Sequence, residues 1–374
     1  MNSKKMDKKI IAYFTTSSTN LGVFNQLVEL AINIDRKSFT PIFILSNDIV
    51  ENHLIKKLKD NNIKVLSLKS NRYYYFFQLF KLIKILKNNN VHIVHTRLRR
   101  CDFYANLSKF FYRVTVVNHI VDDHFDHFTT FHKHLSTSLG VIYKVVSNFA
   151  DAIIANSREN FNYHKKVNPN TYFLNNGIDT NYYRRDDTNR NQLLVKHSIS
   201  ENALNVGFVG EFKKIKGIDL LIEIIKEFKN HKNINFIICA GGDYLRSEFD
   251  NEFNDCNNVF NLGFVTNLNE YYSLFDLQIY TSLSEGMQNV MLESFSSGNP
   301  AICPDAPGYS SLVDSNKGFL VERVKDAYIE KLYLLESNPN IVKEMSLKCR
   351  REMENEHNFI KLSKKLETIY NSLI

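Results

Sequence analysis

The stretch that most constrains the fold runs from Thr281 to Pro304 and reads TSLSEGMQNVMLESFSSGNPAICP. It follows a short apolar run, which predicts the end of a buried strand. Residues 287–295 then space their apolar side chains for a helix with one buried face, and Gly298 and Pro300 end that helix. Another short strand begins at residue 301. A strand, a loop, a helix and a strand in this order predict an α/β fold.

Two glutamates mark this unit. Glu285 lies in the loop and Glu293 lies eight residues later, roughly two helical turns along if the helix reaches back that far. Both carboxylates would then lie near the sheet edge where α/β folds bind ligands, beside free helix-start amides from Gly286 to Val290 that suit an anion. Such a group predicts a nucleotide-sugar site. The simpler alternative is one carboxylate that satisfies the helix dipole and another on the surface.

Length and composition set the class of protein. A chain of 374 residues exceeds one ordinary core and predicts two domains. No apolar run reaches the ~18 residues of a membrane span, and the run at residues 10–14 is too short for a signal peptide. Five scattered cysteines argue against disulfides and zinc. We therefore expect no metal and a cytoplasmic location, with the inner face of the membrane as an alternative.

Charge is divided unevenly along the chain. Residues 1–185 carry 27 Lys and Arg against 13 Asp and Glu, whereas residues 186–374 carry 20 against 27. A basic first half suggests an anionic partner, such as a membrane surface or a phosphorylated acceptor. No nucleic-acid recognition motif is present, so we expect no nucleic-acid partner.

The segment 73–88, YYYFFQLFKLIKILKN, predicts an amphipathic basic helix. It could rest on anionic lipid, or it could simply cover the sheet. Removing Lys81, Lys84 and Lys87 would separate these alternatives.

Polar side chains follow two predicted strands of the first half. Arg97, Arg99 and Arg100 come after the strand at 91–95 and could bind an acceptor phosphate or stay solvated. A strand at 115–121 is followed by DDHFDH, whose spacing fits no standard zinc motif.

Several motifs together resemble a known family. The pattern S-x-x-EG-x-x-NV-x-LES-x-x-SG-x-P over 282–300 is similar to the donor-site signature of the retaining GT-B glycosyltransferases of family 4, also called glycosyl transferases group 1. Residues 151–157 (DAIIANS) and 172–179 (YFLNNGID) resemble two motifs of that family's first domain. Residues 318–321 (GFLV) resemble a late motif of the second.

The resemblance implies the fold class and the domains. It implies an α/β GT-B fold, with two Rossmann-like domains that face each other across a cleft. We expect an acceptor domain over residues 1–185, a nucleotide-sugar donor domain over 186–355 and a C-terminal helix over 356–374 that returns to the first domain. The polar, non-periodic stretch at 182–191 is expected to be the linker.

The resemblance also implies roles for residues. Glu293 would hold the ribose hydroxyls of the donor, and Glu285 would hold hydroxyls of its sugar. The diphosphate would meet amides of the helix start and a basic loop. The implied donor-binding residues are Gly22, Lys213, Lys216, Gly241, Val265, Glu285, Gly286, Met287, Asn289, Val290 and Glu293. The family carries a His at the end of the strand at 115–121, near the reacting sugar, and here His119, Asp122 and His124 all compete for that position. The implied catalytic residues are Glu285, His119 and Asp122.

One departure weakens the resemblance. The family reads G-R-L-x-x-x-KG where this chain has Gly210, Glu211, Lys216 and Gly217. A carboxylate in place of the arginine removes the usual bidentate clamp on the diphosphate. We predict a retaining hexosyltransferase that moves a sugar from a UDP-sugar to a glycan, such as a lipid-linked intermediate of O-antigen, lipopolysaccharide or capsule. A non-catalytic relative that acts in assembly and a GT-B epimerase or phosphorylase remain alternatives.

Overall fold

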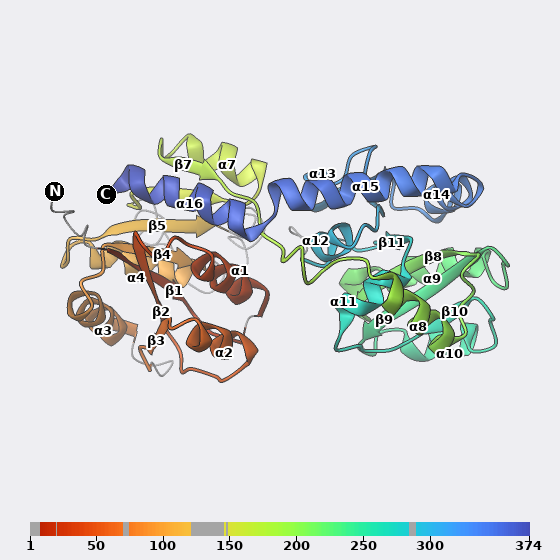
Figure 1. Cartoon of the computed structure of the whole chain (residues 1–374), viewed down its shortest axis with the longest axis horizontal. Coiled ribbons are helices and arrows are strands. Elements are labelled where there is room, and N and C mark those ends of the chain that lie inside the picture. The colour runs from red at the N-terminus through yellow and green to blue at the C-terminus, as the bar shows by residue number, and fades with distance from the viewer. Residues whose placement is uncertain (1–7, 20, 70–74, 121–145, 147–148, 284–288) are drawn as a thin grey trace, which may run out of the picture. The chain divides into compact units, whose positions relative to one another are not determined.

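The structure is a computed structural model that describes residues 8–19, 21–69, 75–120, 146, 149–283 and 289–374. The chain forms two compact units (Figure 1). Unit 1 comprises Met1–Gly177 and Phe359–Ile374, and unit 2 comprises Ile178–Asn358. The units of the structure therefore change at 177/178 and 358/359, whereas the sequence-based boundaries were placed at 185/186 and 355/356.

Unit 1 is built on a seven-stranded parallel sheet in the order β3-β2-β1-β4-β5-β6-β7. The strands are β1 (Lys9–Thr15), β2 (Phe39–Leu45), β3 (Lys64–Ser67), β4 (Ile93–Arg97), β5 (Thr115–Ile120), β6 (Ala152–Ala155) and β7 (Thr171–Phe173). The helices are α1 (Leu21–Ile32), α2 (His53–Asp60), α3 (Tyr75–Asn88), α4 (Arg99–Ser108), α7 (Arg158–Lys165) and α16 (Phe359–Leu373).

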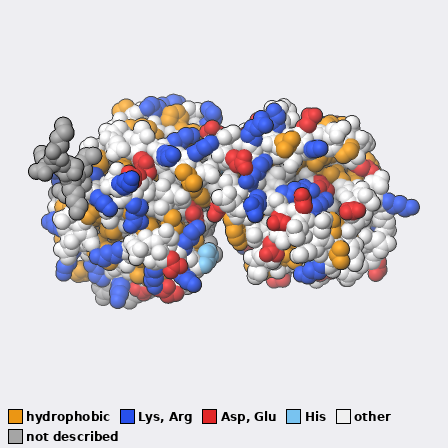
Figure 2. Space-filling model, in the orientation of Figure 1, with side chains coloured by type: hydrophobic (Ala, Val, Ile, Leu, Met, Phe, Trp, Pro, Cys, Tyr) orange, Lys and Arg blue, Asp and Glu red, His pale blue; other side chains and the backbone are white. Residues whose placement is uncertain are grey.

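The two faces of this sheet carry separate cores because side chains alternate along each strand. Ile11 and Tyr13 of β1 pack with residues of α1, α2 and α16. Ala12 and Phe14, which point the other way, pack with residues of α3 and α4. The C-terminal helix α16 therefore belongs to the core of unit 1, where Leu366 is fully buried. On the face drawn in Figure 2, Lys and Arg side chains are spread over unit 1 among hydrophobic ones.

Unit 2 is built on a six-stranded parallel sheet in the order β10-β9-β8-β11-β12-β13. The strands are β8 (Leu204–Glu211), β9 (Ile234–Gly241), β10 (Val259–Asn261), β11 (Leu277–Ile279), β12 (Ala301–Pro304) and β13 (Gly318–Val321). The helices are α8 (Asp187–His197), η1 (Lys214–Lys216), α9 (Ile218–Glu227), α10 (Arg246–Phe253), α11 (Leu268–Tyr271), η2 (Tyr272–Leu274), α12 (Asn289–Ser296), α13 (Pro307–Ser310), α14 (Lys325–Ser337) and α15 (Pro339–Glu356).

Helices cover both faces of this second sheet as well. One face packs against α9, α10 and α14, and the other packs against α8, α11, α12 and α15. Two parallel sheets, each between two layers of helices, confirm the predicted pair of Rossmann-like α/β domains. Within the described part of the chain, no helix is both long enough and apolar enough to cross a membrane.

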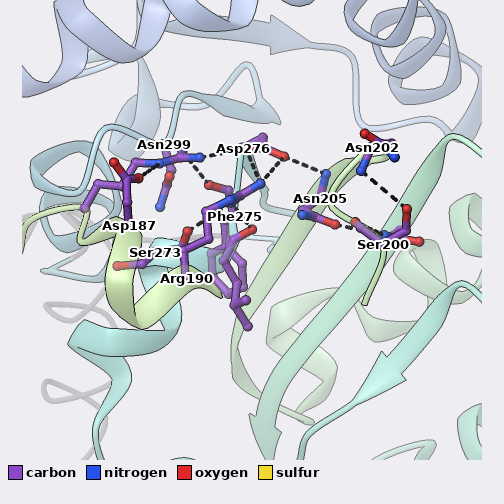
Figure 3. A network of polar contacts seen from close by, with 12 residues as sticks. Asp187, Arg190, Ser200, Asn202, Asn205, Ser273, Phe275, Asp276 and Asn299 are labelled. Atoms are coloured by element: carbon purple, nitrogen blue, oxygen red, sulfur yellow. Dashed lines mark hydrogen bonds and ion pairs between the residues drawn. The ribbon is translucent and has the colours of Figure 1, made fainter. Parts of the chain in front are cut away.

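The expected linker at 182–191 lies inside unit 2, and its second half is helical, because α8 begins at Asp187. Polar contacts hold the start of this helix (Figure 3), and Leu193 and Leu194 farther along it pack into an apolar core. The Asp186 side chain caps it by accepting from the Asn189 amide at 3.0 Å. Arg190 donates to the carbonyls of Ser273 and Leu274 at 3.0 and 2.7 Å. Sequence periodicity did not reveal this helix, because Leu193 and Leu194 are the buried residues of α8 and two adjacent apolar side chains make no helical stripe.

Candidate functional site

All strands of the unit 2 sheet are parallel, so the loops that follow them meet at one edge. These loops begin after Glu211 of β8, Gly241 of β9, Asn261 of β10 and Ile279 of β11. The described donor-binding candidates of the second half lie in these loops, at the end of β9 (Gly241) or in α12, which follows β11. The carboxyl edge of this sheet is therefore the candidate site.

The basic loop after β8 contacts the segment after β11 directly. The Leu283 amide donates to the Ile215 carbonyl at 2.8 Å, and the Thr281 hydroxyl donates to the Lys216 carbonyl at 2.8 Å. Gly217 ends the loop with a φ of +66°, and a Cβ there would lie 2.0 Å from the Thr281 carbonyl oxygen. Only glycine fits this approach. The loop that carries Lys213 and Lys216 thus lies against the chain that leads to Glu285.

Glu211 is paired in the structure. Its carboxylate lies 2.7 Å from the Lys213 ammonium, and both side chains are at least half exposed. The negative charge that replaces the family's arginine is thereby offset by its neighbour. This contact also occupies Lys213, which is one of the predicted donor-binding residues.

A further cation at this edge was not predicted. Arg323 follows β13, and its Nε donates to the Thr281 carbonyl at 3.0 Å. Its guanidinium also lies 3.6 Å from the Asp219 carboxylate near the start of α9. Sequence reasoning missed Arg323 because no motif marks it and because it lies far along the chain from the basic loop.

The loop after β9 is braced by Arg246. This side chain donates to the Ala240 carbonyl at 2.7 Å and stacks over the Phe212 ring at 4.1 Å. Gly241 accepts from the Phe212 amide at 2.6 Å. Phe264, which is 78% exposed, borders the same loop, because a Cβ on Gly241 would lie 3.6 Å from its ring. Val265 beside it is partly buried against the core.

Glu293 lies in the second turn of α12 and is partly buried. The Tyr272 hydroxyl donates to its carboxylate at 3.0 Å, and the Tyr183 hydroxyl also bonds to it. Burial raises the pKa of Glu293, although both tyrosine hydrogen bonds act in the opposite direction. A carboxylate has about four acceptor positions. Two tyrosines therefore orient Glu293 and leave acceptor capacity for a ligand diol.

In unit 1, His119 is buried near the carboxyl end of β5. Its Nδ1 lies 3.1 Å from His95 Nε2, and His95 Nδ1 lies 2.6 Å from the Tyr370 hydroxyl of α16. Burial is the main cause of a lowered pKa in both histidines, and the nearby Arg97 charge lowers it further. The pKa of His119 lies well below its usual value, and that of His95 is lowered to about 3. Both imidazoles are neutral at neutral pH. His119 can therefore donate or accept a hydrogen bond, but it does not carry a positive charge.

Arg97, the last residue of β4, differs from Arg99 and Arg100, which follow the strand. Arg97 is 1% exposed and donates to the Asn176 side chain at 2.9 Å. Arg99 and Arg100 begin α4 and are partly exposed. The alternative in which all three stay solvated is therefore wrong for Arg97.

The remaining predicted residues divide into two groups. Gly22 lies exposed in the first turn of α1, and Asn289 and Val290 begin α12. The others lie outside the described residues, namely Asp122, His124, Glu285, Gly286 and Met287.

A cavity of about 750 Å³ lies at the opposite edge of the unit 2 sheet. Its lining includes Arg185, Arg190 and Asp276 at the amino ends of the strands. Both arginines are already paired with Asp276, at 3.2 and 3.1 Å (Figure 3 shows the Arg190 pair). Because α/β sheets bind ligands at the carboxyl ends of their strands, this cavity is not the candidate site.

Two solved structures share the fold of this chain. Anabaena HepE, solved in complex with UDP, shares the fold with a TM-score of 0.81 at 18% identity, over 97% of this chain and 100% of HepE. A glycosyltransferase from Rickettsia africae shares it with a TM-score of 0.77 at 18% identity, over 98% and 99% of the two chains. The fold is that of the GT-B glycosyltransferases.

Both halves of the chain match glycosyltransferase families. The Glycosyltransferase Family 4 model matches residues 22–182, and the Glycosyl transferases group 1 model matches residues 203–338. The O-antigen biosynthesis glycosyltransferase WbnH of Escherichia coli is 32% identical over 119 residues. The capsular polysaccharide biosynthesis glycosyltransferase CapM of Staphylococcus aureus is 25% identical over 206 residues. The match spans 32% of this chain and a third (33%) of WbnH, and 53% of this chain and of CapM.

Replacing Gly217 tests the contact between the basic loop and Thr281. We expect Gly217→Ala to lower the free energy of unfolding by more than about 2 kcal/mol, because left-handed strain and a backbone clash add. Gly263→Ala is the matched control. Gly263 has a φ of +68° but nothing within 4 Å of a Cβ, so strain alone should cost about 1–2 kcal/mol. Equal losses in urea denaturation of the two variants would contradict the contact.

Replacing Glu293 tests its burial. A carboxyl group with a raised folded-state pKa stabilises the fold while protonated, and that contribution is lost as pH rises through the folded-state pKa. Glu293→Gln should therefore unfold at a higher temperature than the wild type at pH 7.5. The difference should vanish below the unfolded-state pKa of about 4.3.

Glu252→Gln gives the opposite control. Hydrogen bonds from Lys226 and Lys229 lower the pKa of Glu252, so its replacement should lower the unfolding temperature at pH 7.5. If Glu293→Gln instead unfolds at a lower temperature than the wild type at pH 7.5, the charged carboxylate stabilises the fold. That result would contradict a raised pKa for Glu293.

Proposed function

We propose that this chain is a retaining glycosyltransferase that moves a sugar from a UDP-sugar to a glycan acceptor. One observation carries the proposal. At the carboxyl edge of the unit 2 sheet, the basic loop is bonded to the segment after β11, and that segment continues to Glu285 and to Glu293 of α12. The edge would thus combine lysines for a diphosphate with the Glu293 carboxylate for hydroxyls. The family matches of both halves support the same activity.

The donor would bind to unit 2. Glu293, held by Tyr272 and Tyr183, would accept the vicinal hydroxyls of the ribose. Glu285 would accept hydroxyls of the donor sugar. The base would lie along the loops of Gly241 and Val265. UDP as the nucleotide is supported by HepE, whose structures contain UDP and UDP-glucose.

The chemistry follows from charge at the leaving group. When the bond from the anomeric carbon to the diphosphate breaks, its electron pair leaves on the phosphate oxygen. Lys216 and the amides at the start of α12 would stabilise that charge. The acceptor hydroxyl would attack from the face that the diphosphate leaves and pass its proton to the departing phosphate, so the anomeric configuration is retained. Glu285 is not a nucleophile in this scheme, and no metal is required.

The acceptor would be a lipid-linked intermediate of a surface polysaccharide. WbnH and CapM are named for O-antigen and capsular polysaccharide biosynthesis, and residues 1–185 carry the excess of Lys and Arg. Unit 1 would bind this acceptor, with His119 and Gly22 at the carboxyl edge of its sheet. Asp122, which directly follows the same segment, remains the alternative catalytic residue.

A second candidate is favoured by one contact. The Glu211–Lys213 ion pair withdraws a cation from the diphosphate, which suits a GT-B relative that binds partners without catalysis. A wild-type chain that binds no UDP-sugar would favour this candidate. Turnover of donor without acceptor would instead favour a GT-B epimerase, and dependence on free phosphate would favour a phosphorylase.

Calorimetry with UDP and UDP-glucose tests the donor site. Glu293→Ala should weaken UDP-glucose binding by roughly 1–3 kcal/mol, the range for a charged hydrogen bond. Glu211→Arg should bind UDP more tightly, because it frees Lys213 and adds a guanidinium. Glu211→Gln separates the two effects, since it only frees Lys213. Unchanged affinity in Glu293→Ala, or weaker binding in Glu211→Arg, would overturn these roles.

We also propose that α3 rests on an anionic membrane. Its outward stripe consists of Phe77 and Phe80, which are 60% and 51% exposed, and of the exposed Lys81, Lys84 and Lys87. Aromatic rings beside lysines are complementary to an anionic bilayer surface. Lys81 also donates to the Leu68 carbonyl at 3.0 Å, so it helps to hold the helix on unit 1.

Sedimentation with vesicles tests this surface. We expect the double variant Lys84→Glu and Lys87→Glu to lose binding to phosphatidylglycerol vesicles, because each lysine near such a surface contributes about 1 kcal/mol. The double variant Lys343→Glu and Lys348→Glu makes the same charge change on α15 of unit 2 and should bind like the wild type. Equal loss in both variants would indicate a general charge effect and would discard the assignment to α3.

A further inference from the structure

A chain of hydrogen bonds runs from the C-terminal helix to His119. The Tyr370 hydroxyl of α16 lies 2.6 Å from His95 Nδ1, and His95 Nε2 lies 3.1 Å from His119 Nδ1. All three side chains are almost completely buried. His119 Nε2, at the far end, is also buried and has no hydrogen-bond partner among the residues that the structure describes. Three segments of the chain thus meet in one line of hydrogen bonds, which ends on a buried ring nitrogen.

The protons in this line are coupled. A neutral imidazole donates from one ring nitrogen and accepts at the other. If Tyr370 donates to His95, then His95 donates from Nε2 to His119 Nδ1, and His119 carries its own proton on Nε2. If the order is reversed, His119 Nε2 carries a lone pair and can act as a base. The direction of one phenol proton therefore decides the chemistry of His119.

The distances favour donation by Tyr370 to His95. A phenol has one proton, and the other acceptor within reach is the Tyr13 hydroxyl, 3.5 Å away. Good O–H···O bonds span about 2.5–3.0 Å, so that contact is weak. The 2.6 Å approach to His95 Nδ1 is short, as expected for a phenol that donates to an imidazole. The Arg97 guanidinium lies close enough to oppose a positive charge on either imidazole.

We propose that Tyr370 is a positioning residue that, through His95, holds His119 as the tautomer with its proton on Nε2. His119 then presents a fixed N–H donor to an oxygen of the substrate, a sugar hydroxyl or a phosphate oxygen, and does not act as a base. The role in substrate binding rests on the proposed glycosyltransferase function. The tautomer itself does not.

Nitrogen-15 NMR of the full chain, labelled at histidine, measures the tautomer without any assay of activity. We expect the wild-type His119 and His95 signals to show the proton on Nε2, with His119→Gln used to assign the His119 signal. Tyr370→Phe should shift His95 and His119 toward a mixture of tautomers. Tyr13→Phe is the matched control, because it removes an equally buried phenol hydroxyl next to the line, and it should leave both histidines unchanged. A proton on Nδ1 of wild-type His119, or a Tyr370→Phe spectrum equal to the wild type, would overturn the proposal.

Transfer kinetics test the consequence for substrate. Tyr370→Phe should lower kcat on the order of tenfold, the lower end of the loss seen when the hydrogen-bond partner of a metal-binding histidine is removed, whereas its UDP affinity by calorimetry should not change. Tyr13→Phe should keep the wild-type kcat. A tenfold loss in both variants would mean that the hydroxyls act only on stability. If the wild type transfers no sugar, the proposed function fails, whereas the tautomer measurement still decides the relay.

Discussion

The candidate site of unit 2 depends on the absence of one side chain. Gly217 lets the basic loop after β8 lie against the carbonyl of Thr281, and its backbone conformation is one that other residues adopt only under strain. Because Leu283 and Thr281 then bond to the same loop, the lysines and the segment that leads to the two glutamates share one edge of the sheet. Because the strands are parallel, the loop after β8 and the segment after β11 lie at the same edge, and Gly217 allows their backbones to come into contact.

Burial sets the protonation of the polar side chains at Glu293 in unit 2 and at His119 in unit 1. Glu293 keeps a raised pKa because it is withdrawn from water, while Tyr272 and Tyr183 hold it in one orientation. His119 is kept neutral by burial and by Arg97. A buried polar group without a partner is unfavourable, and these side chains are instead tied to tyrosines or to another histidine. Groups held in this way are already oriented when a ligand arrives, which reduces the ordering that binding requires.

Much of the fold could be predicted from the sequence, and less of the site. Apolar runs bounded by glycine and proline indicated the parallel strands, and the spacing of Glu285 and Glu293 indicated a ligand-binding unit. The linker prediction was wrong where α8 begins, because Arg190 holds that helix through contacts with distant carbonyls. No local pattern could indicate that Tyr272 and Tyr183 meet Glu293 or that Arg323 reaches Thr281. Such contacts are made by side chains that folding brings together from remote positions.

The sequence by itself determined which segments become strands and helices, and it determined the motifs that both glycosyltransferase family models match. Periodicity and turn residues act over a few neighbours, so one chain read in order carries that information. Only the tertiary structure decided which groups are charged, paired or buried. It joined Tyr370 to His95 and His119, and it paired Glu211 with Lys213. The physical reason is that protonation and hydrogen bonding depend on the atoms within a few ångströms, and those atoms come from every part of the chain.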